Sequence, residues 1–293
     1  MTKAMLHKWA KRIARDLFII CLAQYGILLI LGFFFIDGIM FSPQPPAYTW
    51  QTSFITNIGS QEKPLAAYWQ PATNATVTIL HSHGNAEEIN DLADIFDALV
   101  QTNINLLAYD YPGYGLSAGK PTEQGCYQAA ETAYRFLTRE KGISPETIIV
   151  LGRSIGSGPA CYLAEKYPVK GLILESGFLS APRVVTRYRL IPVDPFPNAN
   201  RIPRIACPKL IIHGTKDPVI PFWHGQKLYE ISSGEKVFYP IQGGGHNDLQ
   251  LRMGYDIYAD LIHKFVNRQS HLLENKEVAT NNPTIPQQPF LQK

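Results

Sequence analysis

The chain has 293 residues, of which 45% are hydrophobic and 17% are charged. This composition provides enough apolar material for one large domain and excludes a chain that is disordered throughout. The formal net charge of +3 is small for this length, and much of the positive charge lies in the first fifteen residues, so we expect no nucleic-acid partner.

The stretch from Leu17 to Ile36 contains no charged residue. It predicts a membrane-spanning helix, because about 20 helical residues cross about 30 Å of hydrocarbon. We favour an uncleaved signal anchor over a cleaved signal peptide, since the stretch does not end in the small residues that a cleavage site requires. Basic residues precede the stretch and none follows before Lys63. The positive-inside rule therefore predicts a cytoplasmic segment 1–16 and a remainder exported to the periplasmic or other extracytoplasmic side.

The order of the remaining elements predicts one α/β domain over residues 50–268, after a stiff Pro-rich linker over residues 37–49. The expected strands cover residues 77–80, 105–109, 148–151, 171–174, 209–213 and 236–241. The expected helices cover residues 87–100, 122–138, a stretch ending near 167, 222–231 and 252–266. This alternation is typical of a mostly parallel sheet flanked by helices. Prolines interrupt it over 177–205, which predicts an inserted cap, and the polar residues 269–293 predict a disordered tail.

The pentapeptide Gly152-Arg153-Ser154-Ile155-Gly156 lies between the expected strand 148–151 and the helical stretch that follows. A serine at a tight strand-to-helix turn, with glycines two residues to either side, is typical of a nucleophile elbow. The glycines leave room for a strained backbone, and the N–H groups at the start of the helix point toward a developing oxyanion. The motif predicts that Ser154 is the nucleophile of a serine hydrolase with the α/β-hydrolase fold.

A serine hydroxyl needs a neutral imidazole as its base and a carboxylate that holds the imidazole in the right tautomer. In α/β hydrolases the acid and then the histidine follow the nucleophile along the chain. Asp217 comes after the strand 209–213, and His246 comes after the strand 236–241. Both therefore lie at carboxyl ends of strands, where such sheets place their sites. We predict a triad of Ser154, Asp217 and His246, with Glu175 as the rival acid.

Two backbone N–H groups are predicted to stabilise the oxyanion. One belongs to Ile155, directly after the nucleophile, and the other to Asn85, in the loop after the strand 77–80. Together with the triad, they complete the set of groups that acyl transfer requires.

No metal and no cofactor are expected. His81 and His83 could share an ion, but the sequence places no third ligand beside them. Gly113 and Gly115 imitate part of a dinucleotide-binding fingerprint, but Lys120 and Pro121 follow where a helix would have to receive the pyrophosphate.

Several linked motifs resemble those of one family. They are His83-Gly84-Asn85-Ala86, Tyr109-Asp110-Tyr111-Pro112-Gly113-Tyr114-Gly115, Gly142-Ile143-Ser144-Pro145-Glu146, Ser154-Ile155-Gly156, His213-Gly214-Thr215 and Gly245-His246-Asn247-Asp248. Between about residues 76 and 266 the chain resembles the α/β-hydrolase domain-containing proteins of the 17 type, which include eukaryotic protein depalmitoylases. The resemblance implies the same triad, hydrolysis of acyl esters or thioesters, and no cofactor. Those depalmitoylases are held at membranes by an acylated, cysteine-rich N-terminus, whereas this chain has one cysteine in its predicted span.

The expected function is that of a membrane-anchored serine hydrolase, which cleaves a small-molecule or lipid-like acyl ester or thioester through an acyl-enzyme. The enzymatic alternative is a peptidase of the serine aminopeptidase type, which uses the same triad. The alternative from another class is a non-catalytic pseudo-hydrolase that binds lipids or partners. The intact triad and both oxyanion loops disfavour it. The sequence leaves the acyl group, the leaving group and the oligomeric state open.

Overall fold

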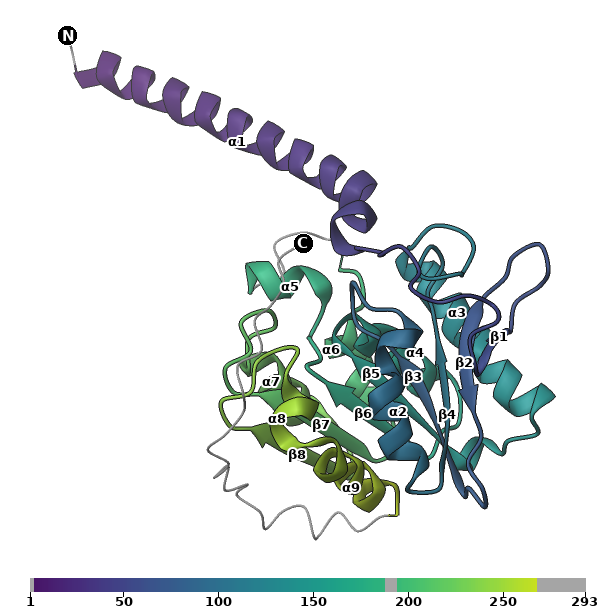
Figure 1. Ribbon diagram of the computed structural model, residues 1–293. Coiled ribbons are helices and arrows are strands. Elements are labelled where there is room, and N and C mark those ends of the chain that lie inside the picture. The colour runs from purple at the N-terminus through teal and green to yellow at the C-terminus, as the bar shows by residue number, and fades with distance from the viewer. Residues whose placement is uncertain (1–2, 188–193, 268–293) are drawn as a thin grey trace, which may run out of the picture.

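The computed structural model describes residues 3–187 and 194–267 (Figure 1). The predicted tail, residues 269–293, and part of the predicted cap, residues 188–193, lie outside the described residues.

One sheet forms the centre of the domain. Its strands are β1 (Ile55–Asn57), β2 (Ala66–Gln70), β3 (Val77–Ser82), β4 (Ile104–Tyr109), β5 (Ile148–Arg153), β6 (Gly171–Glu175), β7 (Lys209–Gly214) and β8 (Lys236–Ile241). Their order in the sheet is β1-β2-β4-β3-β5-β6-β7-β8. The strands from β4 to β8 in this order are parallel, whereas β2 is antiparallel to both of its neighbours. All residues of β3 to β7 are buried, which explains their continuous apolar runs.

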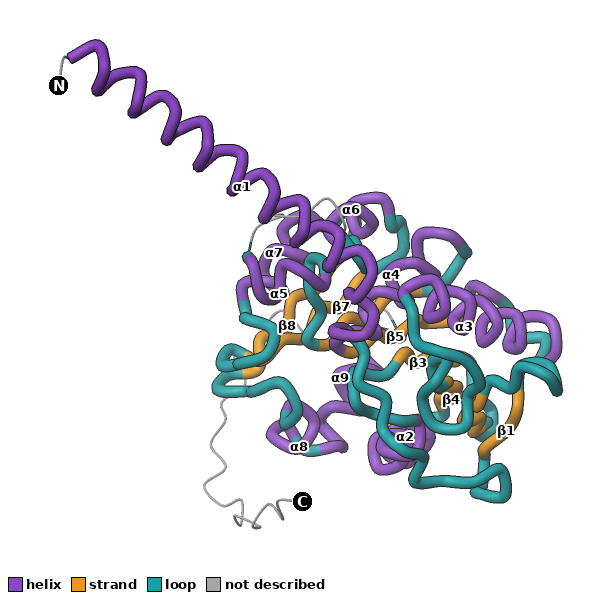
Figure 2. Tube along the Cα trace, turned by 90° about the horizontal axis from the view of Figure 1, so that it is seen from above, coloured by secondary structure: helices purple, strands orange, loops and turns teal. Residues whose placement is uncertain are grey.

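Helices cover both faces of this sheet (Figure 2). The α-helices of the described residues are α1 (Lys3–Met40), α2 (Ala93–Val100), α3 (Glu123–Arg135), α4 (Ser157–Lys166), α5 (Ala181–Thr186), α6 (Asn198–Arg201), α7 (Trp223–Ile231), α8 (Leu249–Met253) and α9 (Tyr255–Val266), of which all but α1 lie along the domain. Helices α2 and α9 pack together on one face, while α3, α4, α6 and α7 lie on the other, and each face has its own hydrophobic cluster. The predicted fold class, a mostly parallel sheet flanked by helices, is confirmed.

α1 is 38 residues long and projects away from the sheet (Figure 1). A helix that crosses a membrane needs about 20 consecutive apolar residues. Among the residues that the structure describes, none of the helices has both the length and the apolar character for such a crossing. This finding contradicts the predicted transmembrane anchor from Leu17 to Ile36, and with it the predicted single-pass topology with a cytoplasmic N-terminus and an exported domain.

The segment after α1 lies against the domain. Phe41 and Tyr48 are buried, and the Phe41 ring meets the rings of Tyr114 and Phe196 edge-on. The Tyr48 hydroxyl donates a hydrogen bond to the Asp110 carboxylate. Both ends of the segment that we expected to act as a spacer therefore contact the domain, while residues 42–47 between them are exposed.

Two buried histidines make the fold sensitive to acid. Burial lowers the pKa of His81 to about 3 and that of His224 to about 4, whereas an unfolded histidine has a pKa of about 6.5. As the pH falls below 6.5, the unfolded chain binds protons that the folded chain does not bind, so stability present at pH 7 is lost toward pH 4. For each such histidine, the free energy of unfolding decreases by up to about 1.4 kcal/mol for every unit by which the pH falls in this range.

We therefore expect the His81→Gln variant to lose less stability than the wild type between pH 7 and pH 5. The difference should be about 2 kcal/mol, because Gln does not titrate. Urea unfolding at both pH values measures it. The variant His7→Gln, at an exposed position of α1, serves as the control. An equal loss of stability in His81→Gln and wild type would contradict the prediction.

Candidate active site

Ser154 lies at a sharp turn between β5 and α4, within the short 3-10 turn Ser154–Gly156. Its φ is 52°, a left-handed conformation that costs a non-glycine residue about 1–2 kcal/mol. A Cβ on Gly152 would lie 2.3 Å from the carbonyl oxygen of Gly156, and a Cβ on Gly156 would lie 2.0 Å from the carbonyl oxygen of Ser82. The turn can therefore form only with glycine at both positions.

The structure brings Ser154, His246 and Asp217 together. His246 Nε2 lies 3.0 Å from Ser154 Oγ, and His246 Nδ1 lies 2.8 Å from Asp217 Oδ2. Asp217 follows β7 and His246 follows β8, and these strands are parallel neighbours, so their following loops meet at one edge of the sheet. In this arrangement the imidazole can accept the serine proton while the carboxylate stabilises the resulting positive charge.

The turn after β7 fixes the Asp217 carboxylate. The N–H groups of Val219 and Ile220 donate to Oδ1 at 2.9 and 2.8 Å, which leaves Oδ2 to accept from His246. Burial acts to raise the pKa of Asp217, but the hydrogen bonds from His246 and the two amides outweigh it and hold the pKa below its ordinary value. Asp217 is therefore ionised at neutral pH.

The rival acid, Glu175, ends β6 but its described contacts lead elsewhere. Its carboxylate accepts hydrogen bonds from Gln250 and from the Tyr258 hydroxyl, the latter at 2.8 Å, and it lies 3.3 Å from Arg153 Nε. The side chain is almost completely buried. Within the described residues, Glu175 therefore belongs to a polar network that does not include the His246 ring.

The two backbone segments with the predicted oxyanion donors lie against each other. Ile155 follows Ser154 directly, and the next residue, Gly156, contacts the backbone of Ser82 and His83 so closely that a side chain there would collide with both carbonyl groups. Asn85 lies two residues beyond His83, in the same loop after β3. The fold therefore brings the Asn85 loop to the turn that carries Ser154.

The side chain of Asn85 ties this loop to the segment after α1. Asn85 Nδ2 donates to the Met40 carbonyl oxygen at 3.0 Å, and Asn85 Oδ1 accepts from the Ser42 N–H at 2.9 Å and from the Tyr114 hydroxyl at 2.5 Å. Because a fixed side chain also limits rotation of its own backbone, these contacts restrict the orientation of the Asn85 N–H group. We expected this segment to be a separate linker, and the sequence predicts none of these contacts.

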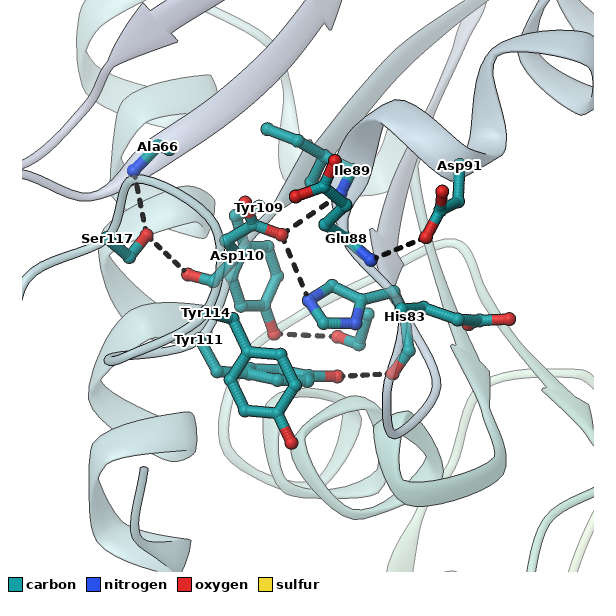
Figure 3. A network of polar contacts seen from close by, with 12 residues as sticks. Ala66, His83, Glu88, Ile89, Asp91, Tyr109, Asp110, Tyr111, Tyr114 and Ser117 are labelled. Atoms are coloured by element: carbon teal, nitrogen blue, oxygen red, sulfur yellow. Dashed lines mark hydrogen bonds and ion pairs between the residues drawn. The ribbon is translucent and has the colours of Figure 1, made fainter. Parts of the chain in front are cut away.

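A buried polar network supports the same loop from Asp110 (Figure 3). Asp110 Oδ1 accepts from the Ile89 N–H at 3.0 Å and lies 3.3 Å from His83 Nε2. The Tyr111 hydroxyl donates to the His83 carbonyl oxygen at 2.7 Å. Asp110 therefore acts on the loop after β3, whereas Asp217, the predicted acid of the triad, contacts His246.

His81 and His83 do not converge on a common ion. The His81 ring meets Phe96 edge-on at 5.9 Å, whereas the His83 ring lies 4.3 Å from the Tyr111 ring. Phe96 and Tyr111 belong to the hydrophobic clusters of opposite faces of the sheet. In the part of the chain that the structure describes, no group of three His, Cys, Asp or Glu side chains is arranged to hold a metal ion.

The parallel sheet and the serine at its strand-to-helix turn define the class of the protein, an α/β hydrolase. The solved structures that share the fold include the following two. An esterase of Pyrococcus furiosus aligns with a TM-score of 0.62 at 17% identity, over 78% of this chain and 98% of that one. The esterase domain of a Rhodothermus marinus protein aligns with a TM-score of 0.59 at 14% identity, over 73% of this chain and 97% of that one. The family model described as serine aminopeptidase, S33, matches residues 73–193.

The chain belongs to the alpha/beta hydrolase domain-containing protein 17 family. It is 36% identical to protein 17B of Homo sapiens over 219 residues. The alignment covers 74% of this chain and 75% of the relative. It is 39% identical over 202 residues to protein 17C of Xenopus tropicalis, over 68% of this chain and 63% of the relative. The family resemblance predicted from the motifs is confirmed.

Two charged residues beside the site, Arg153 and Glu87, form a pair that the sequence does not predict. The Arg153 guanidinium is buried and forms an ion pair with the Glu87 carboxylate. One signal was present in the sequence: Arg153 ends an otherwise apolar strand, and a charge in that setting persists only when it has partners. The partner lies 66 residues earlier, so no local pattern identifies it.

Proposed function

We propose that this protein is a serine hydrolase that cleaves acyl esters or thioesters. Ser154 is the nucleophile, His246 is the general base and acid, and Asp217 orients the imidazole. The observation that carries the proposal is the pair of hydrogen bonds on one ring, with His246 Nε2 at Ser154 Oγ and His246 Nδ1 at Asp217 Oδ2. The neighbouring esterase folds support the same class of reaction.

The reaction proceeds in two halves. His246 Nε2 takes the Ser154 proton as Oγ attacks the acyl carbonyl carbon, and the backbone N–H groups of Asn85 and Ile155 stabilise the oxyanion. The imidazolium then gives its proton to the departing alcohol or thiol, which leaves an acyl-enzyme. Water, deprotonated by the same imidazole, attacks this ester, and the collapse of the second tetrahedral intermediate returns the proton to Ser154 and releases the acid.

Two alternatives share part of this argument. A peptidase of the serine aminopeptidase type is favoured by the family model that matches residues 73–193, and it would use the same three side chains. A non-catalytic protein that binds lipids would not require the hydrogen bond between Ser154 and His246.

Labelling with a fluorophosphonate probe and a substrate panel tests the proposal. The full-length protein should be labelled at Ser154 and should cleave p-nitrophenyl esters and acyl thioesters faster than aminoacyl arylamides. Each buried CH₂ contributes up to about 0.8 kcal/mol, so medium-chain esters should exceed acetate in kcat/KM by about tenfold or more.

The outcomes separate the alternatives. Fast arylamide cleavage with no dependence on acyl length would favour the aminopeptidase. The absence of both labelling and turnover would favour the non-catalytic protein.

A further inference from the structure

Arg153, the residue directly before Ser154, contacts two separate loops and the end of β6 through one guanidinium group. Its Nε lies 3.3 Å from Glu175 Oε1, and one of its terminal nitrogens pairs with Glu87. The other terminal nitrogen donates to the His246 carbonyl oxygen at 3.1 Å and to Asn247 Oδ1 at 2.7 Å. The side chain is 7% exposed, so water does not replace any of these partners.

The ion pair of Arg153 with Glu87 reaches the loop that contains Asn85. While one carboxylate oxygen of Glu87 pairs with Arg153, the other accepts a hydrogen bond from the Gly84 N–H at 2.6 Å. A Cβ on Gly84 would lie 2.6 Å from Glu87 Oε2 and 2.8 Å from an Arg153 nitrogen. The loop backbone therefore rests directly on the ion pair, one residue before the Asn85 N–H that we propose as an oxyanion donor.

The hydrogen bond from Arg153 to the His246 carbonyl oxygen reaches the loop that contains His246. The ring of this same residue contacts Ser154. The Gly245 N–H donates to Asp248 Oδ1 at 2.6 Å, which closes this loop on itself. A hydrogen bond to the His246 carbonyl oxygen thus limits movement of the loop as a unit, and with it the position of the imidazole.

The contact of Arg153 with Glu175 supplies a rigid support. Glu175 is held by Tyr258 and Gln250, on α9 and α8, and all three side chains are buried. The guanidinium lies between this support and the two loops. Its planar group presents donors in several fixed directions, whereas a lysine ammonium on a flexible stem cannot reach the same partners in the same geometry.

We infer, on the basis of the proposed function, that Arg153 is a positioning residue that sets the Asn85 loop and the His246 loop relative to each other. None of its described side-chain contacts is with Ser154 Oγ or the His246 ring. Arg153 directly precedes Ser154 and contacts both loops. It therefore holds the oxyanion donor and the general base in fixed positions relative to Ser154 Oγ. Displacement of a donor or base by about 1 Å costs on the order of 100-fold in rate.

The test compares Arg153→Lys, Arg153→Met and Glu87→Gln with wild type in the full chain. A fluorophosphonate probe titrates the functional sites, and ester turnover is then expressed per labelled site. We expect kcat per labelled site to fall about 100-fold in both Arg153 variants and about 10-fold in Glu87→Gln, with KM within threefold of wild type. Hydrogen exchange should become faster in residues 82–88 and 243–249 together.

Arg201→Lys is the matched control, because Arg201 is a partly buried arginine that pairs with Glu165 and stacks on Tyr127 and Tyr162. It should leave turnover per labelled site and exchange in both loops unchanged. Wild-type turnover per labelled site in Arg153→Lys would overturn the inference, since charge alone would then suffice. Fewer labelled sites that each react at the wild-type rate would also overturn it, because that result indicates a role in folding only.

A failure of the proposed function is recognised separately. In that case the wild type itself would show neither labelling nor turnover. The exchange measurement would then decide by itself whether Arg153 joins the two loops: faster exchange in both supports the linkage, and unchanged exchange in either refutes it.

Discussion

Replacement of Ser154 by alanine is expected to abolish nearly all esterase activity. Ser154 Oγ is the atom that His246 Nε2 contacts at 3.0 Å, and without it no acyl-enzyme forms. His246→Ala should cost as much, because the members of a triad act as a unit and removal of either lowers kcat by about 10⁴- to 10⁶-fold. Turnover of a p-nitrophenyl ester by each variant measures the effect.

Both variants should remain folded. Circular dichroism and the melting temperature should stay close to wild type, since Ser154→Ala even removes a polar atom from a largely buried position. Covalent labelling by the fluorophosphonate probe should disappear in Ser154→Ala. If a well-folded Ser154→Ala protein were still labelled by the probe at another serine, the assignment of Ser154 as the nucleophile would be wrong.

Asp217→Asn is expected to lower kcat by about 10⁴-fold. The amide has the shape of the carboxylate, and its oxygen can still accept from Val219 and Ile220. It then presents an NH₂ group to His246 Nδ1 in place of the oxygen at 2.8 Å. This favours the tautomer with its proton on Nε2, which cannot accept the proton of Ser154. The imidazolium also loses its stabilising charge.

Glu175→Gln provides the comparison. Glu175 is buried and contacts Arg153, Gln250 and Tyr258, so its replacement should act through these neighbours and cost at least 100-fold less than Asp217→Asn. Steady-state kinetics of the two variants, measured on the same ester, decide between the two acids. A larger loss in Glu175→Gln would assign the triad acid to the end of β6.

Features that depend on residues close together in the chain could be predicted from the sequence. The alternation of apolar runs and amphipathic helices specifies the parallel sheet, because a strand covered on both faces must be apolar throughout. The spacing of Gly152, Ser154 and Gly156 specifies the turn, since only glycine fits where a Cβ would collide with a carbonyl group. The positions of Asp217 and His246 after successive strands then follow from the parallel order.

Contacts between segments that lie far apart in the chain could not be predicted from the sequence. The interpretation of residues 17–36 as a membrane span came from hydropathy and was wrong, since no helix among the described residues is suited to a crossing. The contact of Asn85 with Ser42 joins residues 43 positions apart, and that of Arg153 with Glu87 joins residues 66 apart. Such pairs leave no periodic trace in the sequence, because they depend on where loops from different strands end at one edge of the sheet.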